Sequence, residues 1–400
     1  MLRAWINWWV QVATLTWFNL ASVPQRRGAV AAAMFGIAGV VGVFVGTLSI
    51  AEGFRHATTT AGSPRNVIVL RGGSDTEMVS ILTGEEVRWI ADAPGVASDE
   101  HGPLVSAEAF AIINLPKRST GTEANVPLRG VGPAAMRVRE GFRIVAGRMF
   151  DPGKDEVIAG RAAAAEFAGL EPGRRLRVGR QYWRVVGIFA TEGGLAESEV
   201  WTDVRGFQAA YKRRNSYQTV LMRLRSEALF PVCREALEKD PRLNVKVMRQ
   251  DEFYREQSTL VTNLITGLGS IIAGLMAIGA TFGALNTMYS AVAARAREIA
   301  TLRALGFPGG PIVVSILFES VLVALVGGLA GGLVSWAAFD GFQAATMNWQ
   351  SFSQVAFTFD VTPRLMLGGI ACALGIGLIG GLFPALRAAR LPVAAALRES

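Results

Sequence analysis

The sequence predicts an α-helical membrane protein with four transmembrane helices and a large α+β extracytoplasmic domain between the first and second of them. Hydrophobic residues make up 51% of the 400 residues, and charged residues 18%. Residues without charge gather in long runs at 28–50, 257–294, 307–339 and 365–386, the third of which contains one glutamate. A helix needs about 20 predominantly apolar residues to span a bilayer, so each run is long enough for one span. Residues 52–256 have ordinary soluble composition and are numerous enough to form their own core.

Residues 1–27 are predicted to form a cytoplasmic or interfacial amphipathic helix. Trp5, Trp8, Val12 and Leu15 fall on one helical stripe. Aromatic-rich amphipathic helices favour the membrane interface. A helix that packs on the bundle without contacting lipid would have the same pattern, so both interpretations stand.

Residues 28–50 are the first predicted span. A cleavable signal peptide is the alternative, because Ser49, Ile50 and Ala51 look like a small-residue cleavage site. The hydrophobic region of a signal peptide has about 7 to 15 residues, and this run is longer. An uncleaved membrane anchor is therefore predicted.

Residues 51–256 are predicted to form the extracytoplasmic α+β domain. Runs rich in Val, Ile and aromatic residues predict strands at 66–70, 109–115, 156–159, 174–178, 182–190, 200–203, 218–225 and 244–247. Helical periodicity predicts helices at 84–93, 161–170, 204–213 and 226–239. The stretch RRLRVGRQYWRVVGIFA predicts a hairpin that turns near Gly179. The domain is either undivided or has a second lobe over residues 218–250.

The rest of the chain is predicted as a stalk and second span at 257–294, a cytoplasmic helix at 295–310, a third span at 311–338, an extracytoplasmic loop at 339–364, a fourth span at 365–386 and a cytoplasmic tail at 387–400. The second span, at residues 257–294, is longer than a membrane requires. As a helix it would reach about 57 Å, whereas the hydrocarbon core is about 30 Å thick. The surplus is expected to project outward as a stalk. A strong tilt, or a break at Gly267 and Gly269, is the alternative.

Six glycines repeat at four-residue spacing within three of the predicted spans. They form the pairs Gly42 and Gly46, Gly327 and Gly331, and Gly377 and Gly381. Small residues one helical turn apart allow helix backbones to approach closely in lipid. The spacing indicates helix packing, either within one chain or between two copies.

Arginines outside the large domain predict the orientation in the membrane. Ten basic residues lie outside residues 52–256, and nine of them are Arg3, Arg26, Arg27, Arg295, Arg297, Arg303, Arg387, Arg390 and Arg398. By the positive-inside rule, both termini and residues 295–310 are cytoplasmic, and the large domain and the 339–364 loop lie outside. The chain is therefore expected in the cell inner membrane. Residues 52–256 hold 30 Lys and Arg against 27 Asp and Glu, so the net charge of +8 does not indicate a nucleic-acid partner.

Residues 294–310, ARAREIATLRALGFPGG, form a charged segment between two apolar runs. Ile299, Leu302 and Leu305 form a short apolar stripe. The helix is expected to stop at Gly306. A rigid amphipathic helix of this kind suits the docking of a partner. A basic connector lying on anionic lipid headgroups is the alternative.

Five segments of the chain resemble the FtsX/MacB-type permeases of ABC transporters. They are TMYSAVAARAREIATLRALGF, ILFESVLVALVGGLAGGLVSW, GLFPALRAARLPVAAALRES, GRMFDPGKDEVIAGRAAAAEF and RVGRQYWRVVGIFA. The resemblance covers almost the whole chain, and the order of the segments makes it specific. It implies one span, a large periplasmic core domain and then three spans. It also implies a dimer, formed with a second copy or with a paralogue.

In that family, the cytoplasmic helix between the second and third spans couples the permease to a soluble ATPase subunit. The resemblance implies this role for Arg295, Arg297, Glu298, Ile299, Leu302, Arg303, Leu305 and Gly306. It further implies a mechanism called mechanotransmission. In this mechanism, ATP-driven closure on the cytoplasmic side moves the stalks, and the stalks rearrange the outer domains.

The sequence contains no phosphate loop of the form GxxxxGK[ST], so ATP and Mg²⁺ are expected on a separate ATPase subunit. No catalytic, cofactor or metal site is predicted in this chain. Its two histidines, His56 and His101, lack further ligands at metal-binding spacing. Cys233 and Cys372 fall on opposite sides of the predicted membrane boundary, so no disulfide is predicted.

Glu319 is the acidic residue of the third predicted span. An ionisable residue within a span indicates a function by default, and proton coupling is one hypothesis. A carboxylate held by serine or backbone partners inside the bundle would look the same in the sequence. The two interpretations stand side by side.

Two functions follow from the resemblance. The first is an ATP-driven exporter of an amphiphilic or hydrophobic substrate, or of a lipoprotein, from the periplasm or the outer leaflet. Its further expected partners are a periplasmic adaptor protein and the membrane lipids. The second is an FtsX-like signal transmitter that activates an extracytoplasmic partner without transporting substrate. The resemblance to the MacB-type core domain favours the exporter.

Overall fold

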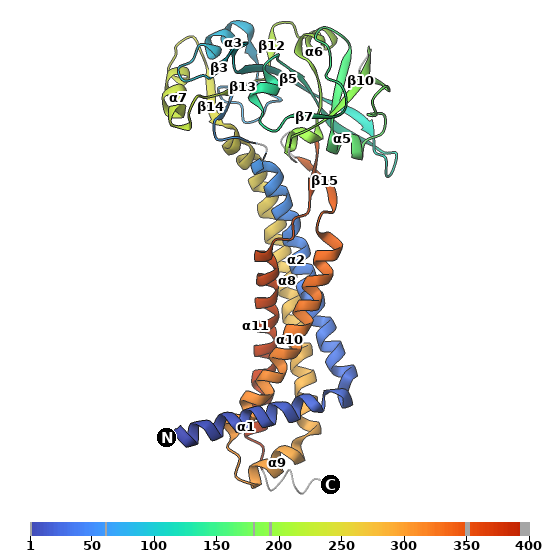
Figure 1. Ribbon diagram of the computed structural model, residues 1–400, viewed down its shortest axis with the longest axis vertical. Helices are drawn as coiled ribbons and strands as arrows, with labels where there is room; N and C mark the ends of the chain where they lie inside the picture. The colour runs from blue at the N-terminus through green and yellow to red at the C-terminus, as the bar shows by residue number, and fades with distance from the viewer. Residues whose placement is uncertain (1, 61, 179–180, 192–193, 349–352, 393–400) are drawn as a thin grey trace. The chain divides into compact units, whose positions relative to one another are not determined.

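The computed structural model describes residues 2–60, 62–178, 181–191, 194–348 and 353–392. The chain divides into two compact units. Unit 1 comprises Met1–Glu52, Leu264–Phe342 and Phe359–Ser400, and unit 2 comprises Gly53–Asn263 and Gln343–Thr358. Unit 1 is helical, whereas unit 2 combines a large sheet with short helices (Figure 1).

Long helices form unit 1 and its connections. They are α1 (Leu2–Ala21), α2 (Arg27–Thr60), α8 (Gln250–Ala294), α10 (Gly309–Phe339) and α11 (Pro363–Ala389), with the short η1 (Val23–Arg26) and α9 (Ala296–Ala304) between them. Within the described residues, four helical segments are long and apolar enough to cross a membrane: Val23–Ala57, Thr262–Ala294, Gly309–Phe339 and Pro363–Ala389. The helix α1 lies across the end of the bundle where α9 is found (Figure 1).

The helix α8 runs without a break through Gly267 and Gly269. A break at these two glycines was the alternative to an outward stalk. The helix is 45 residues long, which corresponds to about 68 Å at 1.5 Å per residue. Gly269 serves close packing, because a Cβ atom at that position would overlap the side chain of Thr47 on α2. No side chain or backbone atom lies within 4 Å of such a Cβ at Gly267.

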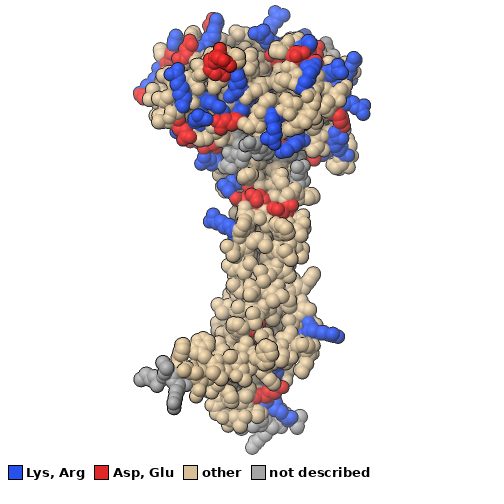
Figure 2. Space-filling view, viewed as in Figure 1, with Lys and Arg blue, Asp and Glu red and all other residues tan. Residues whose placement is uncertain are grey.

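The core of unit 1 lies between α2, α8, α10 and α11. Buried residues in this core are Ile37, Val40, Val41 and Val45 of α2, Ala284 of α8, Ala324 of α10, Val361, and Ala373 and Ile376 of α11. The outward surface of these helices is also apolar, with exposed residues such as Phe35, Leu275 and Leu333. Figure 2 shows few charged side chains along the long helices and many over unit 2. An apolar exterior is expected of helices in contact with lipid tails.

Ten strands of unit 2 form one sheet. Its order is β14 (Val245–Arg249), β1 (Asn66–Arg71), β13 (Thr219–Arg223), β5 (Val105–Pro116), β6 (Glu123–Val131), β11 (Val200–Asp203), β8 (Glu156–Gly160), β10 (Gln181–Ala190) and β7 (Arg143–Gly147), and β9 (Arg175–Val178) pairs with β10. Short two-stranded pairs are β2 (Leu82–Thr83) with β12 (Ser216–Tyr217) and β3 (Ser98–Asp99) with β4 (Gly102–Pro103). The helices of unit 2 are α3 (Gly84–Ala91), α4 (Ala135–Val138), α5 (Arg161–Glu166), α6 (Val204–Ala210), α7 (Phe230–Glu238), η2 (Leu195–Ser198) and η3 (Glu227–Leu229).

Two halves of this sheet have separate hydrophobic cores, which we call lobe 1 and lobe 2. Lobe 1 contains β14, β1 and β13 with α3 and α7, and its core joins Val67 and Ile90 to Val220 and Cys233. The helix α4, which connects β6 to β7, packs on the strands of lobe 1 through Val138 and belongs to that lobe. Lobe 2 contains β6, β11, β8, β10 and β7. Lobe 1 corresponds to the second lobe predicted over residues 218–250, but the structure builds it from both ends of the domain sequence and not from those residues alone.

Two antiparallel strand pairs complete unit 2. The strands β9 and β10 pair antiparallel from Val178 and Gln181, and the predicted turn at Gly179 lies outside the described residues. The segment predicted as a loop at 339–364 contains β15 (Gln343–Asn348) and β16 (Ser353–Thr358), which pair antiparallel. The strand β16 packs against β6 and η2, so this hairpin belongs to unit 2.

Candidate functional site

The charged segment between α8 and α10 folds as the short helix α9, and its ends are sharply defined. Arg295 precedes the helix in a non-helical conformation. At the other end, Gly306 has a φ of +96°, which a residue with a Cβ adopts only with strain. Its N–H donates to the carbonyl of Arg303 at 3.1 Å, and the N–H of Phe307 donates to the carbonyl of Leu302 at 3.1 Å. This pair of bonds is a Schellman motif, which closes the last turn.

Four of the eight residues assigned to partner coupling are exposed in and just after α9. Arg297, Glu298, Leu305 and Gly306 are exposed, and Leu305 exposes 73% of its surface. Thr301 and Ala304 are exposed beside them. At 100° per residue, positions 297, 298, 301, 304 and 305 fall within about one third of the helix circumference. We call these five residues the outer face of α9.

The other four residues point into unit 1. Ile299 is buried in a cluster with Leu15 of α1, Met288 and Val292 of α8 and Ile316 of α10. Leu302 packs against the same cluster. The guanidinium of Arg303 donates to the carbonyl of Leu391 at 2.7 Å. These residues anchor α9 on the bundle, and their side chains are not available to a partner in this arrangement.

Glu319 lies on α10 next to this anchored face, and its side chain is only 2% exposed. Its carboxylate forms an ion pair with Arg26 of η1. Its second oxygen lies 3.6 Å from Nη1 of Arg295, the residue that precedes α9. One buried carboxylate thus faces two guanidinium groups, which supply the charge that burial would otherwise leave uncompensated.

Asn19 of α1 completes the cluster. Arg295 donates to its side-chain oxygen at 2.8 Å and to its backbone carbonyl at 3.0 Å. The side-chain amide of Asn19 donates to the hydroxyl of Ser315 on α10 at 3.3 Å. A cavity of about 30 Å³ lies among these residues, room for about one water molecule. The cluster therefore joins α1, η1, the start of α9 and α10 at one point.

The sequence analysis singled out Glu319, but the structural role that it offered for this carboxylate had the wrong kind of partner. The partners are arginines, not serine or backbone groups. Arg26 lies 293 positions away from Glu319, and Arg295 and Asn19 are 276 positions apart. No spacing rule connects residues at such distances. The only available signal was the excess of arginine at the ends of the spans.

The six glycines of the spans pack within the chain. A Cβ atom at Gly327 or Gly331 would overlap backbone atoms of α2, and one at Gly46 would overlap Phe339. Gly377 and Gly381 of α11 are equally close to Ala324 and Ser320 of α10. Gly42 has more room, because its nearest neighbour would lie 3.6 Å away.

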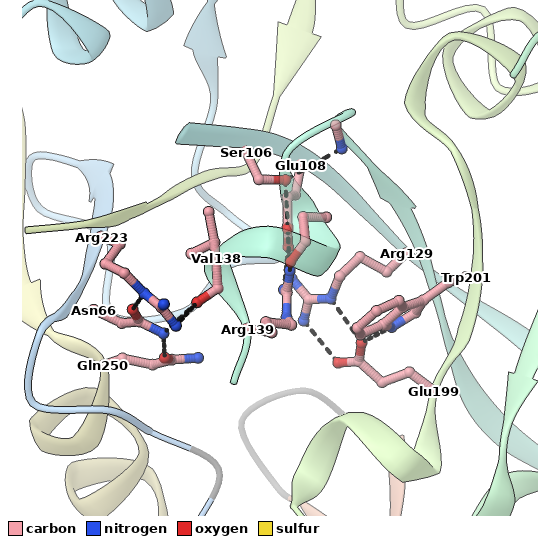
Figure 3. Close-up of polar contacts among 12 residues, drawn as sticks. Asn66, Ser106, Glu108, Arg129, Val138, Arg139, Glu199, Trp201, Arg223 and Gln250 are labelled. Atoms are coloured by element: carbon pink, nitrogen blue, oxygen red, sulfur yellow. Dashed lines mark hydrogen bonds and ion pairs between the residues drawn. The ribbon is translucent and has the colours of Figure 1, made fainter. Parts of the chain in front are cut away.

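A second group of charges lies inside unit 2, and sequence reasoning missed it (Figure 3). Arg139 donates to both oxygens of Glu108 at 2.6 and 2.7 Å, and Arg129 donates to both oxygens of Glu199 at 2.7 Å. The indole of Trp201 donates to Glu199 at 2.6 Å. Burial by itself raises the pKa of the Glu108 carboxyl, but the guanidiniums of Arg139 and Arg129 together hold that pKa below its ordinary value.

Two family models together match most of the chain. Residues 30–240 match the family model of the MacB-like periplasmic core domain, and residues 270–393 match that of the FtsX-like permease C-terminal region. The chain belongs to the MacB/FtsX-like family of ABC transporter permeases. The predicted family and fold class are confirmed: four transmembrane helices, with a MacB-like α+β domain between the first and second.

Curated relatives of this MacB/FtsX-like permease are longer than the chain itself. It is 27% identical over 385 residues to the macrolide export ATP-binding/permease protein MacB 1/2 of Paracoccus denitrificans (strain Pd 1222), an alignment that covers 92% of this chain and 55% of the relative. It is 26% identical over 427 residues to the macrolide export ATP-binding/permease protein MacB of Bordetella avium (strain 197N), which covers 100% of this chain and 62% of the relative. Among solved structures, the extracellular domain of the noncanonic ABC-type transporter YknZ from Gram-positive bacteria aligns with 46% of this chain and 100% of that chain, at 20% identity and a TM-score of 0.35.

Proposed function

We propose that this chain is the permease subunit of an ATP-driven exporter that acts by mechanotransmission on an amphiphilic or hydrophobic substrate, or on a lipoprotein, from the periplasm or the outer leaflet. The observation that carries the proposal is α9, whose inner face is anchored to the bundle while its outer face is exposed. Such a helix can receive a push from a soluble partner and pass it to the spans. Family membership supports the same role.

ATP hydrolysis takes place outside these 400 residues, which hold no GxxxxGK[ST] loop. The soluble ATPase binds the outer face of α9. In this arrangement α9 and both termini are cytoplasmic and unit 2 is periplasmic, in agreement with the positions of the arginines. Arg297 and Glu298 give the outer face charges of both signs, which favour a complementary partner surface.

The substrate class is supported by an apolar groove of unit 1. The groove lies along α2 and α10, is lined by residues such as Phe35, Gly39, Val43 and Val334, and has a volume of about 750 Å³. Sites for drug-sized ligands typically have about 300 to 1,000 Å³. A groove of this size and character suits a hydrophobic molecule or an acyl chain.

A second copy of the chain, or a paralogue, pairs along α8. Six of the exposed apolar residues on this helix fall on one stripe: Leu264, Leu268, Ile271, Leu275, Ile278 and Phe282. Their spacing alternates between four and three residues, the 3.5-residue period of helix pairs that pack side by side. The opposite side of α8, with Ala273 and Ala284, is buried in the bundle.

The ATPase contact is tested by co-purification of the chain with its soluble ATPase. Glu298→Lys and Leu305→Asp alter the outer face of α9 without touching its anchor, so complex formation and ATP turnover should fall about tenfold or more. Glu235→Lys is the matched control, a charge reversal at another exposed glutamate, on α7 of unit 2. Wild-type binding in both outer-face variants would refute the proposed contact.

Transport and signalling are distinguished by filling the groove. Gly39→Trp places an indole in the groove, because Gly39 lines the groove and a Cβ atom at this position has no neighbour within 4 Å. The control is Gly36→Trp. Gly36 is also on α2 and has open space around it, but it does not line the groove. An exporter loses substrate-stimulated ATP turnover in the Gly39 variant alone. A transmitter that binds no substrate there retains its turnover in both.

A further inference from the structure

The sheet of unit 2 passes from lobe 1 to lobe 2 along a single strand, β5. Its first residues, 105–108, pair with β13 of lobe 1, and residues 109–116 pair with β6 of lobe 2. Glu108 is the last residue paired to lobe 1, opposite Thr219, and Ala109 is the first paired to lobe 2, opposite Gly130. The crossing point lies between these two residues.

Arg129 lies on β6 beside this crossing and ties the two lobes together. From lobe 2, Glu199 binds it through both oxygens at 2.7 Å. From the loop between β1 and β2 of lobe 1, Glu77 binds it through both oxygens at 2.7 and 2.9 Å. Glu108 lies 3.2 Å from the same guanidinium. The Arg129 side chain is 3% exposed, so these pairs form away from water and are strongly coupled.

A cavity of about 130 Å³ lies next to this cluster. Asn66, Gln250 and Tyr254 line it from lobe 1 and the start of α8, and Thr191 and Glu199 line it from lobe 2. Its lining is rich in polar groups, and its volume is well above the roughly 10 to 15 Å³ that a cavity needs to hold one water molecule. Close-packed protein interiors contain few spaces of this size.

Polar contacts stiffen the lobe 1 wall of the cavity. Asn66 donates to the side-chain oxygen of Gln250 at 2.9 Å, and Arg223 donates to the carbonyl of Val138 at 2.6 Å. Figure 3 shows this group on one side of Arg139 and the group of Arg129, Glu199 and Trp201 on the other. The space therefore lies where two stiff polar groups meet.

We propose that the two lobes of unit 2 turn relative to each other about β5 at Glu108 and Ala109, and that the pair of Glu77 with Arg129 is the lock that holds them closed. The polar cavity supplies the room for the turn. This inference goes beyond the proposed function, because the motion is a property of unit 2 and requires no ATPase.

Charge decides which of the pairs can open. When Glu77 leaves, Arg129 keeps its bidentate pair with Glu199 and its contact with Glu108, so no buried charge is left without a partner. Glu77 itself enters water at little cost, since its side chain is already 11% exposed and lies on a loop. Release of Glu108 would be far more costly, because its side chain has no exposed surface.

The test measures the distance between the lobes in the full chain in lipid nanodiscs, by electron spin resonance. One spin label is attached at Lys239→Cys at the end of α7, and the other at Tyr182→Cys on β10, positions that are 74% and 62% exposed. Cys372 is replaced by alanine. Cys233 remains, because burial raises the pKa of its thiol to about 11 and keeps it from the labelling reagent at neutral pH. The wild-type chain should give one narrow distance distribution.

Glu77→Gln removes the charge of the lock and nearly preserves its shape. The ratio of open to closed lobes should rise on the order of tenfold to a hundredfold, as expected for the loss of a charge-assisted pair, and a second distance should appear. Glu77→Asp, one methylene shorter, should shift the ratio in the same direction. The control is Glu171→Gln, which breaks the exposed pair with Arg118 within lobe 2 and should leave the distribution unchanged.

Two outcomes overturn the proposal. If both Glu77 variants fold, as judged by tryptophan fluorescence, and keep the wild-type distance distribution, the cluster only stabilises the core. If neither variant folds, Glu77 is required for folding, and it cannot be a lock that opens in the folded chain.

Discussion

At the scale of single residues, both units use a buried charge to join segments that are remote in sequence. In unit 1 the carboxylate of Glu319 faces Arg26 and Arg295. In unit 2 the guanidinium of Arg129 faces Glu77 and Glu199. Both central groups are at least 97% buried, so each needs partners of opposite charge in a place where water cannot solvate it.

We predict that Glu319→Gln lowers the stability of the helical unit by about 3 kcal/mol, because two arginines then lose their common partner. The measurement is thermal unfolding in detergent. Glu298→Gln, on the outer face of α9, is the control and should change stability by less than about 0.5 kcal/mol. Adding Arg26→Gln to Glu319→Gln should recover part of the loss. If Glu319→Gln is as stable as wild type but loses transport, proton coupling becomes the better explanation of this residue.

Glu108 should make unit 2 sensitive to acid. Because the two arginines hold its pKa below the ordinary value of 4.5, its stabilising contribution is fully present above that value and is lost as the pH falls through the lower, folded-state pKa. Urea unfolding followed by tryptophan fluorescence, which reports on the buried Trp183 and Trp201, should give a falling free energy of unfolding below about pH 4.5. A free energy that stays constant down to pH 3 would contradict this assignment.

At the scale of elements, the helices of unit 1 depend on small residues where their backbones meet. Gly331 of α10 faces the backbone of Ala38 on α2, and Gly377 of α11 faces Ala324 of α10. Backbone atoms cannot move aside as a flexible side chain can. Each close contact therefore sets the distance between two helices. The position of α9 is in turn fixed by α8 and α10, the helices that it connects.

Gly331→Ala is expected to destabilise the bundle by about 1 to 3 kcal/mol, because the new methyl group overlaps the backbone of α2. Gly42→Ala provides the comparison: its methyl group would lie 3.6 Å from the hydroxyl of Ser335, an ordinary contact. That variant should be neutral or gain up to about 1 kcal/mol from the higher helix propensity of alanine. Thermal unfolding of the two variants in detergent measures the difference, and equal stabilities would show that α2 and α10 are less tightly packed.

At the scale of the whole molecule, the two units differ in the surface that they expose. The long helices of unit 1 expose apolar side chains, while charged side chains cover unit 2 (Figure 2). These surfaces suit lipid and water respectively. Along α8 the apolar surface is also regularly spaced, a pattern that contact with lipid alone does not require.

Cross-linking in membranes tests the pairing of two copies along α8. Ile271→Cys lies on the exposed stripe, and Met276→Cys lies about a third of a turn away from it on the same helix. With Cys372 replaced by alanine, mild oxidation should link the Ile271 variant into dimers and leave the Met276 variant monomeric, because a disulfide requires Cα atoms within about 7 Å. Equal yields from the two positions would indicate random collisions and not a defined helix pair.

The sequence by itself was sufficient for features that depend on local pattern. Apolar runs longer than a bilayer is thick predict spans wherever they occur, and the stop signals around Gly306 predict a short helix before α10. The alternation of strand-like and helix-like runs was enough for an α+β domain. These features depend on interactions of each segment with its solvent or with its own near neighbours, which every window of sequence contains.

Only the tertiary structure decided which residues meet. It turned Ile299 inward and Leu305 outward on α9, brought Arg26 to Glu319, and built lobe 1 from both ends of the domain sequence. It also paired Glu77 with Arg129 across the two lobes. Such contacts are chosen by the packing of whole elements and by the cost of burying a charge alone, and neither quantity is present in any local stretch of the chain.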